Sequence, residues 1–322
     1  MMDDITLQDI HQAAERIRPY IHHTPVLTSN SLNRMIGALV FLKCENLQKV
    51  GAFKARGACN AVFSLSEEEA RQGVVTHSSG NHAQALAYAA RLRSIPAYIV
   101  MPSNASAVKK AAVEGYGGRI TYCDPTQEAR EATANKILEE TGAAFIHPYD
   151  NLRVIAGQGT AALELVKEVA DLDVVLAPVG GGGLLSGTCV AVCSSSRARV
   201  VGAEPEAADD AYRSLQAGKI LPSLHPKTVA DGLLTSLGTL TFPIIRRLVS
   251  QIVTVSEAAI VYSMRALWER AKIVVEPSGA VPVAVLLEKG VDFAGQRIGV
   301  ILSGGNVDLD HLPWVEMADH NA

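Results

Sequence analysis

The sequence predicts an α/β fold in which parallel sheets are covered by helices on both faces. Short segments rich in β-branched residues alternate with helix-like stretches for most of the chain. Parallel strands need a crossover connection between them, and strands buried on both faces read as apolar runs. The glycine run 180–183 lies between such a strand and a helix-like segment. Parallel sheets hold their ligands at the carboxyl ends of strands, so this run is a candidate ligand loop.

The predicted strands and helices follow one another along the chain. An amphipathic helix is expected near the N-terminus, after the acidic Met1-Met2-Asp3-Asp4. The later strand–helix pairs are 74–77 with 81–92, 97–101 with 107–114, 119–123 with 127–141, and 145–147 with 158–170. Strand 174–179 precedes the glycines, and strands 199–203 and 298–302 follow. Gly142 supplies the expected helix stop after residue 141.

Three strand ends carry small, polar or glycine-rich residues, namely 78–82, 180–183 and 303–306. Loops at equivalent ends of a parallel sheet point to one shared cleft. Residues 70–147 read as a compact set of βα units inserted in a larger whole. We therefore predict a large domain made of 1–69 plus 148–322, and a small, mobile, substrate-binding domain made of 70–147.

Composition excludes several classes of partner. The 322 residues carry a net charge of −4 without a basic block, so no nucleic acid or anionic membrane is expected. No apolar run reaches transmembrane length, and the acidic N-terminus is neither a signal nor a transit peptide. The five cysteines lack CxxC spacing, which gives no zinc site and favours a reducing cytoplasm.

The glycine loop predicts a phosphate site. It contains no Lys or Arg, so the free amides at the start of the following helix would bind the anion. A flexible linker would not lie between a buried strand and an apolar helix. The dinucleotide-binding spacing of glycines and the Walker sequence are both absent. Glu204, at the end of the next strand, keeps an NAD-dependent oxidoreductase open as an alternative.

Lys54 is the second informative residue. It lies at a loop-to-helix transition beside Phe53 and small residues. A lysine beside an aromatic ring can lose solvation, lower its pKa and attack an aldehyde, although most lysines are surface charges. Together with a phosphate loop made of amides, Lys54 suggests an aldehyde that carries a phosphate, pyridoxal 5′-phosphate (PLP).

Four segments in order resemble those of fold-type II PLP enzymes. They are Gly51-Ala52-Phe53-Lys54-Ala55-Arg56-Gly57-Ala58, Ser78-Ser79-Gly80-Asn81-His82, Gly180-Gly181-Gly182-Gly183 and Ser303-Gly304-Gly305-Asn306. The resemblance is greatest to the serine racemase and serine/threonine dehydratase branch, and it runs from about Ile5 to Trp314. It implies a two-domain fold similar to the β-subunit of tryptophan synthase, with parallel twisted sheets and flanking helices. We do not expect the extra C-terminal regulatory domain of long biosynthetic threonine dehydratases.

The resemblance implies a PLP site. Lys54 would form the Schiff base and remove the α-proton of the substrate. Ser303 would donate to the pyridine nitrogen without forcing its protonation, which favours β-elimination over transamination; a turn at a strand end is the alternative. The other cofactor-binding residues would be Phe53, Asn81, Gly180, Gly181, Gly182, Gly183 and Leu184. Phe53 could instead be a core residue, and Asn81 could cap a helix.

The same resemblance implies the substrate contacts. Ser79 occupies the position of the second proton-transfer residue of racemases, on the face opposite the lysine. Ser78, Asn81 and His82 resemble the loop that binds the substrate carboxylate. Arg130 aligns with an arginine near the substrate, but on a helix with Glu128 and Glu131 it could equally lie on a solvated face.

A divalent-cation site is also implied. Glu204, the carbonyl of Ala208 and Asp210 resemble an oxygen-only site suited to Mg²⁺, with Ca²⁺ or Mn²⁺ as other occupants. The alternative is a solvated acidic loop. The resemblance further implies a homodimer.

We therefore expect a PLP-dependent racemase and ammonia-lyase that takes small β-hydroxy amino acids, a serine racemase with serine/threonine dehydratase activity. An L-threo-3-hydroxyaspartate dehydratase is the alternative within the class, with Arg130 as the candidate for a second carboxylate. An NAD-dependent oxidoreductase leaves Lys54 and the Ser303 loop unexplained. A non-catalytic binding domain would not need Lys54.

Overall fold

The structure is a computed structural model that describes residues 5–314 and contains two β-sheets. The larger sheet has six strands, in the order β1 (Val26–Leu27), β2 (Leu39–Cys44), β10 (Arg297–Leu302), β7 (Val174–Pro178), β8 (Arg199–Pro205) and β9 (Gln251–Val255). All neighbours run parallel except β1 and β2 at one edge. The predicted parallel sheet is confirmed, with one short antiparallel edge strand added.

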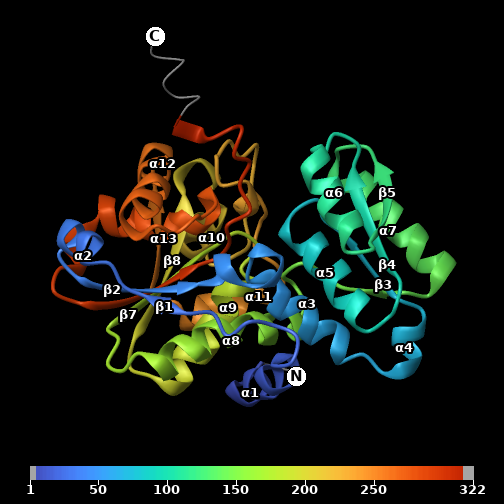
Figure 1. Ribbon diagram of the computed structural model, residues 1–322, viewed down its shortest axis with the longest axis horizontal. Coiled ribbons are helices and arrows are strands. Elements are labelled where there is room, and N and C mark those ends of the chain that lie inside the picture. Colours follow the sequence, from blue (N-terminus) through green and yellow to red (C-terminus); the bar gives the residue numbers. More distant parts are fainter. Residues whose placement is uncertain (1–4, 315–322) are drawn as a thin grey trace, which may run out of the picture.

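The smaller sheet is entirely parallel. Its order is β5 (Arg119–Cys123), β4 (Ala97–Pro102), β3 (Val74–His77) and β6 (Ala144–Phe145). Figure 1 shows this sheet and its helices beside the larger one, as a second lobe of the molecule. All four strands lie within residues 70–147, but the proposed domain limits and the mobility of the smaller part remain predictions.

Thirteen α-helices are assigned within residues 5–314. They are α1 (Leu7–Ile17), α2 (Asn30–Ile36), α3 (Lys54–Phe63), α4 (Glu67–Arg71), α5 (Asn81–Leu92), α6 (Ala107–Gly115), α7 (Gln127–Thr141), α8 (Leu152–Glu168), α9 (Gly183–Ser195), α10 (Asp210–Ala217), α11 (Thr241–Leu248), α12 (Glu257–Ala266) and α13 (Pro277–Glu288). The expected amphipathic helix is α1, and the acidic residues before it lie outside the described part. None of the helices in residues 5–314 combines the length and hydropathy that a membrane span requires.

Helix α8 begins earlier than the sequence suggested, at Leu152 instead of residue 158. Asn151 caps it by accepting a hydrogen bond from the amide of Val154 at 3.2 Å. The glycines near its start do not end the helix. They lie where neighbouring helices come so close that a side chain would not fit. A Cβ on Gly157 would lie 2.5 Å from the carbonyl oxygen of Arg56 in α3, and one on Gly159 would lie 2.8 Å from that of Gly187 in α9.

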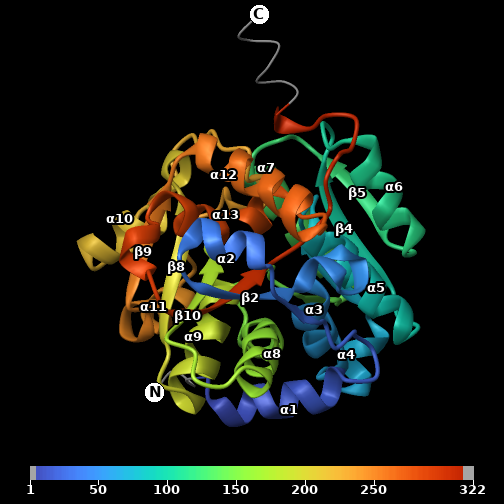
Figure 2. The ribbon, with the colours of Figure 1, turned by 60° about the vertical axis from the view of Figure 1, so that its left-hand side comes forward.

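The central strands of the larger sheet are buried on both faces. Along β7, Val174 and Leu176 join the apolar cluster that includes α12 and α13, whereas Val175 and Ala177 join the cluster of α8 and α9. This period of two is that of a strand between two helical layers. Figure 2 shows these layers, with α12 and α13 on one side of the sheet and α8, α9 and α1 on the other.

Candidate active site

Lys54 is the first residue of α3 and follows a chain segment that pairs with the end of β10. The amide of Phe53 donates to the carbonyl of Ser303 at 3.0 Å, and the amide of Gly305 donates to the carbonyl of Gly51 at 2.9 Å. These bonds flank an antiparallel bridge between Ala52 and Gly304. The backbone before Lys54 is therefore fixed against the 303–305 loop, although the two segments are far apart in sequence.

The amine of Lys54 lies in a protein environment that disfavours its charge. Its Nζ donates to the carbonyl of Pro148 at 2.8 Å and lies 5.1 Å from the centre of the Phe53 ring. Burial lowers the pKa of Lys54 from 10.5 to about 8, and the carboxyl of Glu276 partly offsets this. A lysine with such a pKa is neutral often enough near pH 7 to act as a base or a nucleophile. Phe53 also packs against the apolar cluster of α8 and α9, as the core alternative proposed.

The glycine loop connects β7 to α9, as the sequence predicts. Gly182 is the residue before the helix and has a left-handed backbone, with φ of 87°. The first hydrogen bond of the helix is donated by the Ser186 amide to the Gly182 carbonyl at 2.8 Å. The amides of residues 183–185 consequently have no partner within the helix, which is the arrangement that binds an anion.

The loop needs glycine for a second reason, which is close packing. A Cβ on Gly181 would lie 2.3 Å from the ring of Tyr149, and one on Gly183 would lie 2.5 Å from Oε1 of Gln158. Gln158 is fully buried, and neither polar atom of its side chain has a hydrogen-bond partner within the described residues. A buried amide without partners beside free helix amides fits a bound polar group.

Asn81 is the first residue of α5, and its side chain bonds to the larger sheet instead of capping its own helix. Its Nδ2 donates to Oε1 and Oε2 of Glu276 at 2.9 and 3.2 Å, and its Oδ1 accepts from Nδ2 of Asn306 at 2.8 Å. Asn306 in turn donates to the carbonyl of Val50 at 2.7 Å and, through its amide, to Glu276 at 3.1 Å. These bonds bring the 78–82 and 303–306 loops together, as expected of one cleft.

Glu276 is a site residue that the sequence analysis missed. It precedes α13, whose first residue is Pro277, and only 5% of its surface is exposed. Burial raises the pKa of its carboxyl to about 7, against the effect of the Asn81 amide that donates to it. Its carboxylate partly offsets the effect of burial on the pKa of Lys54. The proline at the start of a helix was the one available signal, and it says nothing about the carboxylate.

The remaining substrate residues of the 78–82 loop follow β3. Ser78 and Ser79 are partly buried, and Ser78 Oγ accepts weakly from the Gly80 amide at 3.4 Å. The ring of His82 is buried, with Nε2 3.2 Å from the carbonyl of Ile146, so Nε2 carries the proton. Burial lowers the pKa of His82 well below 6.5, so the ring is neutral. His82 can thus contact a carboxylate through its backbone amide, and not as a cation.

Arg130 lies on α7, beside the carboxyl end of β3. Its charge lowers the pKa of His77, which burial lowers more. The side chain is partly buried, and its Nε has no hydrogen-bond partner among the described residues. Arg130 is therefore not merely a charge on a solvated face, and it has an unused donor.

The segment between β6 and α8 contributes contacts that the sequence did not reveal. The Nδ1 of His147 accepts from the amide of Asp150 at 2.9 Å, so its proton is on Nε2. Burial lowers the pKa of His147 to about 4 and keeps the ring neutral. The His147 and Tyr149 rings meet edge to face, with centres 4.5 Å apart. The carbonyl of Pro148 accepts from Lys54 and the Tyr149 ring covers Gly181, so this segment borders both the lysine and the glycine loop.

Glu204 and Asp210 flank the start of α10. Glu204 accepts from the amides of Ala211 and Tyr212, each at 2.8 Å, and burial raises its pKa to about 8. Both carboxylate oxygens of Asp210 are buried without a well-formed hydrogen bond to any described residue, as is the hydroxyl of Ser223. Ala208 ends the short turn between the two acids. Buried oxygens that lack donors fit an oxygen-coordinated divalent cation.

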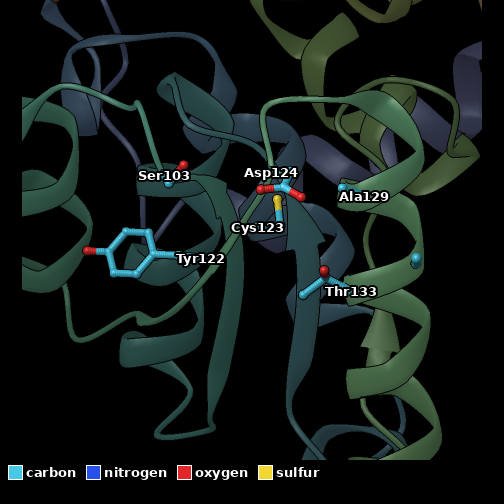
Figure 3. Close-up of a pocket in the computed structure, with 7 residues that line it drawn as sticks. Ser103, Tyr122, Cys123, Asp124, Ala129 and Thr133 are labelled. Carbon is cyan, nitrogen blue, oxygen red and sulfur yellow. The ribbon is translucent and has the colours of Figure 1, made fainter.

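A separate hollow of about 480 Å³ lies at the edge of the smaller sheet, where β5 ends and α7 begins. Figure 3 shows Ser103, Tyr122, Asp124 and Thr133 around it. None of the site residues predicted from the sequence lines this hollow, so it is distinct from the cleft that holds Lys54.

The comparison with known proteins agrees with this arrangement. The profile of the family described as pyridoxal-phosphate dependent enzyme matches residues 17–304, so the chain belongs to that family. PLP is accordingly its cofactor. The chain is 54% identical to the beta-hydroxyaspartate dehydratase of Paracoccus denitrificans, over 96% of this chain and 98% of the relative.

Two solved structures are similar over nearly the whole chain. The serine racemase of Dictyostelium discoideum has a TM-score of 0.91 and 52% identity, and covers 95% of this chain and 99% of its own. The maize serine racemase has a TM-score of 0.93 and 46% identity, with coverages of 98% and 98%. A threonine deaminase is also among the similar structures, with a TM-score of 0.90 and 48% identity. The fold is therefore that of fold-type II PLP enzymes, and the relatives are racemases and dehydratases.

Proposed function

We propose that this enzyme racemises serine and also dehydrates serine and threonine to a 2-oxo acid and ammonia. The observation that carries the proposal is Lys54, a lysine of lowered pKa whose amine donates to a backbone carbonyl and, within residues 5–314, has no carboxylate as a hydrogen-bond partner. Both reactions begin with loss of the α-proton, so one base serves both. When bound, PLP supplies the electron sink that makes this proton removable.

The residues that hold the cofactor are those of the loops around Lys54. The free amides of residues 183–185 would bind its phosphate, and the Ser303 hydroxyl would donate to its ring nitrogen. The Asn81 side chain would bind the ring hydroxyl, and the Glu276 carboxylate orients that side chain through its two bonds to Nδ2. Because Ser303 is a neutral donor, it does not stabilise a protonated ring nitrogen as a carboxylate would, which favours rapid loss of a β-leaving group.

Lys54 and Ser79 divide the proton transfers. The neutral Lys54 amine takes the α-proton, and Pro148 O holds it in position by accepting from Nζ at 2.8 Å. Ser79 lies in the loop after β3 of the smaller sheet. It delivers or removes a proton on the face of the substrate opposite Lys54. When Ser79 delivers a proton before the β-hydroxyl leaves, the D-enantiomer results. When the hydroxyl first takes up a proton and leaves as water, the remaining enamine hydrolyses to 2-oxo acid and ammonia.

The substrate carboxylate binds at the start of α5. Backbone amides of the first turn and the hydroxyl of Ser78 are its donors. The neutral ring of His82 supports this loop through its bond to Ile146 and does not bear a charge.

A specific observation favours a second substrate, 3-hydroxyaspartate. Arg130 has a buried Nε without a partner among the described residues, and a β-carboxylate would supply one. The 54% identity to a beta-hydroxyaspartate dehydratase supports the same interpretation. In this case dehydration dominates, and Ser79 only positions the substrate.

The proposed cation site is Glu204, the Ala208 carbonyl and Asp210, with Mg²⁺ or another hard divalent ion. The support is that neither carboxylate oxygen of Asp210 has a well-formed hydrogen bond within the described part of the chain. The ion would neutralise two buried carboxylates and steady the start of α10.

Two further proposals concern assembly and location. We propose a homodimer, which light scattering after gel filtration would test. All five cysteines are unpaired, which supports the reducing cytoplasm.

The test is a substrate panel on the PLP-loaded protein with Mg²⁺, in which 2-oxo acid and D-amino acid are followed together. Formation of D-serine from L-serine supports the racemase. Fast turnover of L-threo-3-hydroxyaspartate with slow serine turnover selects the second candidate. Absence of elimination and racemisation on every substrate would refute both.

Ser79→Ala and Ser78→Ala make a matched pair within the panel. Ser79→Ala should lower racemisation at least about tenfold more than elimination, because only racemisation needs the second face. Ser78→Ala should lower both activities alike. Equal losses in Ser79→Ala would mean that Ser79 only positions the substrate.

A further inference from the structure

Asp150 binds a distant segment with an unusual number of hydrogen bonds. Its Oδ1 accepts from the amides of Leu240 and Thr241 at 2.8 and 3.3 Å, and its Oδ2 accepts from the amide and the hydroxyl of Thr239 at 3.0 and 2.9 Å. It thereby satisfies the free amides that precede and open α11. Gly238 comes so close that a Cβ there would overlap the Asp150 carboxylate. One carboxylate therefore fixes the conformation of residues 238–241.

Residues 237–241, which we call the bridging segment, contact the glycine loop. The Thr241 hydroxyl donates to the carbonyl of Gly181 at 2.8 Å. A Cβ on Gly182 would lie 2.8 Å from Leu237 and 2.9 Å from the Thr241 hydroxyl. The bridging segment is thus packed against the turn that exposes the anion-binding amides.

The N-terminal side of the bridging segment is joined by hydrogen bonds to α10, the helix that begins at Asp210. The hydroxyl of Ser214 in α10 accepts from the amide of Leu221 at 2.8 Å. Two residues further on, the amide of Ser223 donates to the hydroxyl of Ser236 at 2.8 Å, and Ser236 directly precedes the bridging segment. Residues 221–223 therefore connect α10 to the bridging segment.

Tyr149 makes a second connection parallel to the first. Its ring covers Gly181. Tyr149 directly precedes Asp150 in the chain, so the residue that covers the glycine loop lies beside the carboxylate that holds the bridging segment.

We propose that Asp150 is a positioning residue that couples the cation site at Glu204 and Asp210 to the phosphate-binding glycine loop. It does so by holding the bridging segment in the one conformation in which this segment is connected to both the cation site and the glycine loop. A cation at Asp210 orders the start of α10, residues 221–223 connect α10 to the bridging segment, and the bridging segment contacts Gly181 and Gly182. The inference rests on the proposed cation and phosphate sites. By linkage, the cofactor must then raise the affinity for the cation by the same factor as the cation raises the affinity for the cofactor.

The experiment measures Ca²⁺ binding by calorimetry, on PLP-loaded protein and on protein stripped of PLP, after both are freed of metal. For the natural sequence, Ca²⁺ should bind at least about fivefold more tightly to the PLP-loaded form. In Asp150→Asn, the amide nitrogen cannot accept the bonds that Oδ2 or Oδ1 accepted. The ratio of the two affinities should fall towards one while Ca²⁺ still binds.

Three variants serve as controls. Asp173→Asn removes a carboxylate that accepts from the Arg297 amide at 2.8 Å, at the opposite end of β7, and should keep the full ratio. Asp210→Asn should abolish Ca²⁺ binding. Thr239→Val removes only the side-chain bond to Asp150 and should lower the ratio in part, which keeps the test valid if Asp150→Asn does not fold.

The outcomes separate the two levels of the proposal. Ca²⁺ binding with equal affinity for both forms of the natural protein overturns the coupling alone, as does a full ratio in Asp150→Asn. Absence of Ca²⁺ binding overturns the cation site as well, and the substrate panel then still tests the chemistry independently.

Discussion

At the scale of single residues, the proposed chemistry depends on the ionisation of Lys54. Its amine has a carbonyl as its hydrogen-bond acceptor, and the carboxylate that raises its pKa, Glu276, is already bonded to Asn81 and to the Asn306 amide. Burial therefore outweighs the attraction of Glu276, and the pKa falls to about 8. The neutral amine is the form that attacks an aldehyde and accepts a proton.

The rate at which the cofactor-free enzyme captures PLP should follow this pKa. The rate should rise with pH as the ammonium loses its proton, and level off above about pH 8. The measurement is the growth of the visible absorbance after rapid mixing, with Nα-acetyl-lysine as the reference amine. A rate that keeps climbing to the ordinary lysine pKa of 10.5 would show that the protein does not lower the pKa of Lys54.

At the scale of elements, the site is made of loops at the carboxyl ends of β3, β7 and β10, joined by the segment between β6 and α8. The glycine loop is held from both sides, by the ring of Tyr149 and by the hydroxyl of Thr241. Its amides are therefore prepared before an anion arrives, which reduces the ordering cost of binding.

Gly181→Ala tests this packing. The new Cβ would lie 2.3 Å from the ring of Tyr149, so the loop or the ring must move. Overpacking of this kind costs about 1–3 kcal/mol, and we expect PLP to bind about 10- to 100-fold more weakly. The control is Gly115→Ala, where nothing lies within 4 Å of the new atom. Equal PLP affinity in both variants would mean that the loop has room that the structure does not show.

The sequence predicted the elements well where the signal was local. Glycines mark turns, and β-branched runs mark buried strands, so the glycine loop, Lys54 at a helix start and the limits of α7 were all predictable. Asp150 and Glu276 were not, because their roles arise from partners 91 and 195 residues away. A single carboxylate in a sequence carries no mark of a distant backbone amide.

At the scale of the whole molecule, a buried charge cluster holds α3 against the larger sheet. Arg56 is fully buried and pairs with Glu45, just after β2, at 2.7 Å and with Glu164 of α8 at 2.7 Å. The buried Lys43 pairs with Glu164 at 2.7 Å and with Glu168 at 3.3 Å. Both cations share the carboxylates of α8, so the pairs form one ion-pair network. Arg56, the buried arginine of this network, lies two residues after Lys54 in α3.

Arg56→Met should lower the free energy of unfolding by about 3–5 kcal/mol, because it leaves the buried Glu45 carboxylate without its partner. The matched control is Arg265→Met, which removes the exposed pair with Glu269 at 2.8 Å and should cost less than about 1 kcal/mol. Urea unfolding of both proteins measures the difference. Similar losses in the two variants would show that the cluster does not stabilise the molecule.

The mechanism as a whole depends on Lys54 being the residue bonded to PLP. The most direct measurement is reduction of the PLP-loaded protein with borohydride, followed by proteolysis and mass spectrometry of the labelled peptide. We expect one pyridoxyl group, on Lys54, and none on Lys54→Ala, whereas Lys219→Ala, which changes an exposed lysine, should be labelled as the natural protein is. A label on any other lysine, or a label retained by Lys54→Ala, would contradict the mechanism.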